Sequence, residues 1–189
     1  MKAVLINGSP RSKGNTYSML KTISGKLSES DIKTEMIHIG GKAINGCKAC
    51  RKCGENKNLQ CTIKDELSPV ISSLLNADII VMGSPTYFAD ITPELKALID
   101  RSGVVARSNN HALSRKIGSA VVAGRRGGSI HAFNSINNFF LINGMIIPGS
   151  TYWNISRSAA IGDFENDDEG VQTIDQLGKN ISWLANRLQ

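Results

Sequence analysis

The chain has 189 residues, a formal net charge of +6, and a composition that is 41% hydrophobic and 20% charged. A chain of this size can bury a full hydrophobic core, and its composition excludes a largely disordered protein. Its basic residues are scattered and only 5% of all residues are aromatic, so we expect no nucleic-acid partner. No apolar run approaches the ~18 residues of a membrane span, and we expect no membrane partner.

The predicted elements alternate between strands and helices. In chain order they are a strand at 3–6, a helix at 15–28, a strand at 34–39, a helix at 66–76, a strand at 78–83, a helix at 93–105, a strand at 117–123, a helix at 129–143, a short strand at 145–147 and a helix at 171–188. The third strand, ADIIVMG, is apolar throughout, which is typical of a strand buried on both faces.

This alternation predicts an α/β protein with parallel strands and right-handed crossovers. We expect a flavodoxin-like three-layer sandwich around a five-stranded parallel sheet of order 2-1-3-4-5. No linker or repeat divides the chain, so residues 1–189 are expected to form a single domain with a cysteine-rich insert at 45–61. The apolar run at 3–6 is too short for the core of a secretory signal, and we predict a cytoplasmic location.

A Gly-Ser-Pro triplet follows two of the predicted strands. Gly8-Ser9-Pro10 comes after the first strand and Gly83-Ser84-Pro85 after the third. In the predicted order these strands are neighbours at the point where the direction of strand addition reverses, which is where such sheets bind ligands. The two triplets should therefore line one crevice.

The loop between the first strand and the first helix, SPRSKGNT at 9–16, is a candidate phosphate site. It offers hydroxyls, an amide, an arginine, flexible backbone at Gly14 and the positive end of a helix dipole. The alternative is a plain turn with Asn15 as helix N-cap. The loop matches neither GxGxxG nor GxxxxGK[ST], which disfavours a dinucleotide fold and a P-loop NTPase. The candidate phosphate-binding residues are Ser9, Arg11, Ser12, Gly14, Asn15 and Thr16.

Three segments together resemble the NADPH-dependent FMN reductase-like branch of the flavodoxin superfamily: NGSPRSKGNT at 7–16, GSPTYFADITPELKALIDR at 83–101 and AGRRGG at 123–128. The resemblance implies FMN as a non-covalent cofactor, with its phosphate in the 9–16 loop. It also implies that two further sets of residues border the flavin. These are Pro85, Thr86, Tyr87 and Phe88 beside the ring and ribityl chain, and Gly124, Gly127 and Gly128, where the backbone would approach the ring.

All four cysteines of the chain fall within one short segment. They are Cys47, Cys50, Cys53 and Cys61, spaced C-x2-C-x2-C-x7-C. Three closely spaced thiols and a fourth further on suit an iron–sulfur cluster better than zinc, which usually takes two separated C-x2-C pairs. The motif also resembles that of the iron–sulfur flavoproteins. A [4Fe–4S] cluster is the leading hypothesis, and free thiols or a labile disulfide remain the alternative.

The function expected from these features is that of an FMN-dependent oxidoreductase passing electrons between FMN and the cluster. The donor would be NAD(P)H or a ferredoxin-like protein, and the resemblance favours a homodimer or homotetramer. Two alternatives stay open: an NAD(P)H-dependent flavin or quinone reductase without a cluster, and a non-catalytic redox sensor. Because the flavin itself accepts hydride, no protein acid or base is required and no catalytic residue is named.

Several other residues are assigned structural roles. We expect Trp153 and Trp183 to pack in the interior, Trp183 at helical spacing from Ile174, Leu177 and Ile181. The acidic stretch 162–170 lacks the spacing of a calcium loop and is expected to be a solvated loop.

Overall fold

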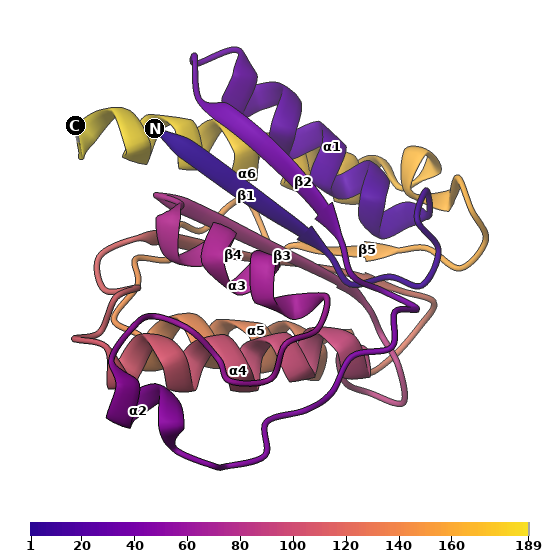
Figure 1. Cartoon of the computed structure of the whole chain (residues 1–189). Helices are drawn as coiled ribbons and strands as arrows, with labels where there is room; N and C mark the ends of the chain where they lie inside the picture. Colours follow the sequence, from indigo (N-terminus) through magenta and orange to yellow (C-terminus); the bar gives the residue numbers. More distant parts are fainter. Residues whose placement is uncertain (189) are drawn as a thin grey trace.

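The computed structural model describes residues 1–188 and contains one five-stranded parallel sheet of order β2-β1-β3-β4-β5 (Figure 1), so the predicted strand order is confirmed. The strands are β1 (Lys2–Asn7), β2 (Lys33–His38), β3 (Ile79–Pro85), β4 (Ile117–Gly124) and β5 (Ile155–Arg157). The helices are α1 (Asn15–Ser28), α2 (Lys52–Asn56), α3 (Leu67–Asn76), α4 (Pro93–Ser108), α5 (Ser129–Ile142), the 3-10 helix η1 (Asp163–Asn166) and α6 (Asp168–Arg187).

The sheet forms the middle of three layers. Helices α1 and α6 cover one face, and α3, α4 and α5 cover the other (Figure 1). Alternate residues of the central strands point to opposite layers: Leu5 and Val81 pack toward α1 and α6, whereas Val4 and Ile80 pack toward α3, α4 and α5. This arrangement explains why the third strand is apolar throughout, as the sequence predicts.

The fifth strand predicted at 145–147 is wrong. Ile146 forms only a single bridge with Ile117, at the beginning of β4, and the chain then leaves the sheet. Pro148 has no N–H to continue a ladder, and Gly149 follows it. The chain returns as β5, which pairs with Val122–Gly124 at the other end of β4. The run MII at 145–147 resembles a strand because it is apolar, but its first residue, Met145, packs in the core from a loop.

The expected interior packing of both tryptophans is also wrong. Trp183 is 62% exposed and Trp153 is 52% exposed. On α6 the buried face carries Ile181, and a residue two positions later points to the opposite side of the helix. The Trp183 ring is covered instead by the guanidinium of Arg187, 5.8 Å from its centroid. The Trp153 ring packs against Tyr152 on the surface, with centroids 4.8 Å apart.

Within residues 1–188, every helix is too short or too polar to cross a membrane.

Replacement of Phe140 by alanine should be strongly destabilising. This ring is fully buried on α5 and lies against Gly118 of β4, where even a Cβ would come within 2.6 Å of it. A phenylalanine-to-alanine change at such a site removes about 3–5 kcal/mol of unfolding free energy, measurable by urea denaturation. The neighbouring Leu141→Ala is the control, because Leu141 is 63% exposed and its loss should cost well under about 1 kcal/mol. Equal losses in the two variants would contradict this packing.

Candidate functional site

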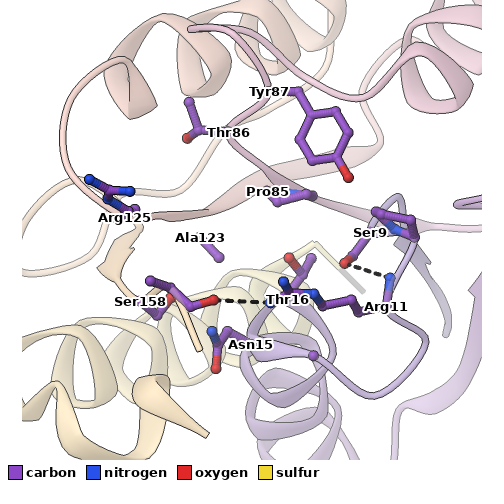
Figure 2. A pocket seen from close by; sticks show the side chains of 13 residues that line it. Ser9, Arg11, Asn15, Thr16, Pro85, Thr86, Tyr87, Ala123, Arg125 and Ser158 are labelled. Atoms are coloured by element: carbon purple, nitrogen blue, oxygen red, sulfur yellow. Dashed lines mark hydrogen bonds between the residues drawn. The ribbon is translucent and has the colours of Figure 1, made fainter. Parts of the chain in front are cut away.

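A cavity of about 220 Å³ opens beyond the carboxyl ends of the central strands. Both Gly-Ser-Pro turns contribute to it, so the predicted shared crevice is confirmed (Figure 2). The lining residues are Ser9, Pro10, Arg11, Gly14, Asn15, Thr16, Pro85, Thr86, Tyr87, Ala123, Arg125, Ser158 and Ala159.

Buried polar contacts shape the 9–16 loop before any ligand is bound. The Asn7 side chain is fully buried; its Oδ1 accepts the N–H of Ser9 (3.0 Å) and its Nδ2 donates to the carbonyl of Ser12 (3.1 Å). A ring nitrogen of His38 lies 2.7 Å from the Ser9 carbonyl oxygen. The loop is therefore held by neighbours on both sides, which leaves little conformational entropy to lose on binding.

The loop presents hydrogen-bond donors and positive charge to the cavity. Helix α1 begins at Asn15, directly behind Gly14, and the N–H groups of its first turn have no acceptor within the helix. Together with the positive end of the helix dipole, these N–H groups form a site that favours an anion. Of the predicted phosphate residues, only Ser12 lies outside the cavity lining.

The Asn15 side chain has a role that the sequence does not reveal. Its Nδ2 donates to the carbonyl of Ala160 (2.7 Å), and its Oδ1 accepts the N–H groups of Gly162 (3.1 Å) and Phe164 (3.3 Å). The amide thus fastens the beginning of α1 to the segment between β5 and α6. The backbone of Asn15, rather than its side chain, remains available to a ligand.

The segment after β5 forms a wall of the cavity that sequence analysis missed. Arg11 extends across the cavity, where its Nη1 donates to the carbonyl of Ala159 (3.0 Å, Figure 2). The carboxylate of Asp163 holds this wall by accepting the N–H groups of Ala159 (2.8 Å) and Ala160 (2.7 Å). These two bonds lower the pKa of Asp163 below its ordinary value of 3.8. The acidic stretch 162–170 therefore shapes the site instead of being only solvated.

The opposite wall comes from the end of β3. Pro85, Thr86 and Tyr87 line the cavity, and Thr86 Oγ1 lies 2.9 Å from the hydroxyl of Ser129. Phe88 does not line it: its side chain is fully exposed, and its backbone adopts the left-handed conformation with φ 43°. Arg125 adds a second cation to the cavity from the loop after β4.

The three candidate glycines of this loop differ in what surrounds them. A Cβ on Gly124 would lie 1.9 Å from Ser129 Oγ, and one on Gly128 would lie 2.9 Å from the Cα of Ala89. These two glycines therefore allow protein segments to pack together. A Cβ on Gly127 would meet nothing within 4 Å, so no side chain crowds this position. None of the three glycines lines the cavity.

The four cysteines line a second cavity, also of about 220 Å³, beside α4. Cys47 and Cys50 are exposed, Cys61 is half-buried and Cys53 is buried on α2, a short helix that the sequence did not predict. The segment is backbone-strained, since Ala49, Arg51, Lys57 and Leu59 all have positive φ. Among residues 1–188, no three His, Cys, Asp or Glu side chains are arranged as metal ligands.

One of these thiols is biased toward the thiolate form. The Cys50 sulfur lies 3.5 Å from Thr62 Oγ1, and this contact, with the backbone N–H of Lys52, lowers the pKa of Cys50. Thiolate is the form that binds metals. The donor set, four thiols bordering one cavity, fits an iron–sulfur cluster in its chemistry.

Comparison with known proteins identifies the family. The profile of the NADPH-dependent FMN reductase family matches residues 1–160. The chain belongs to this family. It is 36% identical to an iron-sulfur flavoprotein of Methanocaldococcus jannaschii over 98% of this chain and 97% of that protein. It is also 32% identical to an iron-sulfur flavoprotein of Methanosarcina thermophila, over 100% and 97% of the two chains. The predicted resemblance to this branch is confirmed.

A solved structure supports the fold assignment. The flavodoxin, WrbA-like protein from Agrobacterium tumefaciens superposes with a TM-score of 0.69 over 100% of this chain and 99% of that chain, at 14% sequence identity. The flavodoxin-like fold is thus shown.

The bonds to Asp163 predict a pH-dependent stability. Because the pKa of Asp163 is lowered in the folded state, its contribution to the unfolding free energy is fully present above pH 3.8. That contribution is lost as the pH falls through the lower pKa of the folded state. The variant Asp163→Asn should therefore be less stable than the unchanged protein at pH 7, and the difference should shrink below pH 3.8. Thermal unfolding of both proteins over a pH series measures this. A difference that stays constant with pH would show that the charge of Asp163 plays no part.

Proposed function

We propose that this protein is an FMN-dependent oxidoreductase that passes electrons between FMN in the first cavity and an iron–sulfur cluster in the cysteine cavity. The observation that carries the proposal is the first cavity itself. One of its sides is a helix N-terminus with an arginine, and the other is the proline and tyrosine wall at the end of β3. Membership of the FMN reductase family and the names of the relatives support the same assignment.

The FMN phosphate would be held by the 9–16 loop. Ser9 and Thr16 supply hydroxyls, the first turn of α1 supplies N–H groups, and Arg11 supplies charge. Arg11 is already oriented across the cavity by the Ala159 carbonyl, so little side-chain freedom is lost when it meets a phosphate.

The flavin ring would lie between the β3 turn and the glycine-rich loop. Pro85 and Tyr87 offer flat apolar surface in the cavity. The uncrowded backbone at Gly127 would offer polar groups to the ring edge. FMN, when bound, supplies the hydride and electron chemistry. The protein's part is to bind and orient the cofactor and to keep one side of it accessible to a donor. NAD(P)H and a ferredoxin-like protein are the donor classes that we propose.

The four cysteines would hold a [4Fe–4S] cluster. Their common cavity and the names of the most similar relatives favour this over a flavin or quinone reductase without metal. The cluster site and the FMN site have no lining residue in common, so each can be altered without the other. Assembly as a homodimer or homotetramer is part of the proposal.

Replacement of Arg11 by alanine should weaken FMN binding selectively. Arg11 is exposed, so we expect a loss of about tenfold in affinity, the effect of one partly screened charge-assisted bond. Riboflavin, which lacks the phosphate, should bind both proteins equally. Fluorescence titration of the apoprotein with each flavin measures this.

The control for that titration is Arg126→Ala. Arg126 is an exposed arginine of the loop after β4 that does not line the cavity, and its loss should not weaken FMN binding relative to riboflavin binding. A parallel loss of FMN and riboflavin binding in Arg11→Ala would contradict the phosphate assignment.

Replacement of Cys50 by serine should remove the cluster and retain the flavin. Serine is a poor ligand for iron, and Cys50 is exposed, so the fold should tolerate the change. Iron and sulfide content should fall to background while extracted FMN stays at the level of the unchanged protein. Iron content that survives the substitution would show that Cys50 is not a ligand.

A further inference from the structure

Arg101 of α4 is a buried cation whose contacts surround the cysteine segment. It is 1% exposed. Its Nη1 donates to Asp65 Oδ2 (2.7 Å) and to the carbonyl of Asn45 (3.1 Å), and its Nη2 donates to the carbonyl of Ile63 (3.0 Å). Asn45 precedes the first cysteine, and Ile63 and Asp65 follow the last. The guanidinium therefore joins the two ends of the segment that carries all four thiols.

The Nε–H of this guanidinium is not used. Nε of Arg101 is buried and has no hydrogen-bond partner among residues 1–188. A buried charged N–H without an acceptor is costly, so such a group commonly indicates an acceptor that arrives with a ligand. Arg101 lines the same cavity as the cysteines.

The acceptors available to Nε are few. Apart from backbone carbonyls, the cavity side chains are thiols, cations, aliphatic groups and Thr62, whose hydroxyl already meets Cys50. Of the four cavity thiols, Cys61 is the nearest in sequence to Ile63 and Asp65, which Arg101 already contacts.

We propose that Arg101 is a positioning residue for the cluster, with its Nε–H donating to the sulfur of Cys61 when the four thiols bind iron. This rests on the proposed function, because it requires the cluster to be present. A donor and a buried positive charge beside a ligand sulfur stabilise the more negative, reduced form of a cluster. Arg101 would therefore raise the reduction potential of the cluster.

Among the cations of the cavity, Arg101 should have the largest effect on the reduction potential of the cluster. Lys48 and Arg51 also line it, but both are exposed, and solvent and salt screen their charges. The charge of Arg101 acts through a low-dielectric interior, where Asp65 is its ion-pair partner.

A second residue of the same region provides a matched control. Asn109, which is 8% exposed, directly follows α4 and also holds the cysteine segment. Its Nδ2 donates to the carbonyl of Cys53 (3.3 Å), and its Oδ1 accepts the N–H of Leu59 (3.2 Å). It does not line the cysteine cavity. Asn109→Ala should loosen the segment without removing a donor or a charge from the sulfurs.

The test compares Arg101→Lys, Arg101→Met and Asn109→Ala in the full chain, purified without oxygen. The midpoint potential of the cluster is measured by redox titration followed by electron paramagnetic resonance, and bound FMN reports folding. We expect the potential to fall in Arg101→Lys, which loses Nε–H, and to fall further in Arg101→Met, which also loses the charge. In Asn109→Ala the potential should stay at that of the unchanged protein, although a chelator should remove iron faster.

Each contrary outcome has a distinct meaning. An unchanged potential in the Arg101 variants that retain FMN and iron would overturn the role of Arg101 and leave the cluster proposal intact. If Arg101→Met binds no FMN and is therefore not folded, the cluster potential of Arg101→Lys alone tests the role of Arg101, since lysine retains the positive charge that pairs with Asp65. Iron-free unchanged protein would overturn the cluster proposal and, with it, the role of Arg101.

Discussion

The close parallel approach of β1 and β3 is the constraint on which the first site depends. The N–H of Gly8, directly after β1, donates to the carbonyl of Gly83 at 2.9 Å, two residues before the end of β3. A Cβ on Gly8 would lie 3.0 Å from that carbonyl oxygen, and one on Gly83 would lie 2.7 Å from the methyl group of Thr16. Glycine at both positions lets the two turns and the beginning of α1 come together. A helix N-terminus suited to an anion and an apolar turn suited to a ring then border one cavity.

Local chemistry was predictable from the sequence, and contacts between distant segments were not. The strand order and the shared crevice follow from apolar runs and two repeated triplets, which are short-range signals. The wall formed by Ser158 and Ala159 depends on the Asn15 amide and the Asp163 carboxylate, and no pattern in the sequence links position 15 with position 160. The misplaced fifth strand has a similar cause. The apolar run at 145–147 reaches only the beginning of β4, where Pro148 prevents it from continuing the ladder, and the short β5 pairs with the other end of β4.

The cysteine cavity also combines residues that the sequence predicts with one that it does not. The spacing of the thiols predicts a common site, and all four do border one cavity. Arg101, which lies 40 positions beyond Cys61 in numbering, could be placed there only by the packing of α4 against the segment. The two cavities lie on different parts of the fold, one at the strand ends and one beside α4. The two sites that we propose, one for FMN and one for a cluster, can thus be adjusted by different residues.

An absorption spectrum of protein purified without oxygen, combined with extraction of the flavin and analysis of iron and sulfide, tests whether this chain carries both cofactors. We predict flavin bands with broad iron–sulfur absorption, about one FMN per chain, and about four iron and four sulfide per chain. Protein that contains neither flavin nor iron, and takes up no FMN when it is added, would contradict the account.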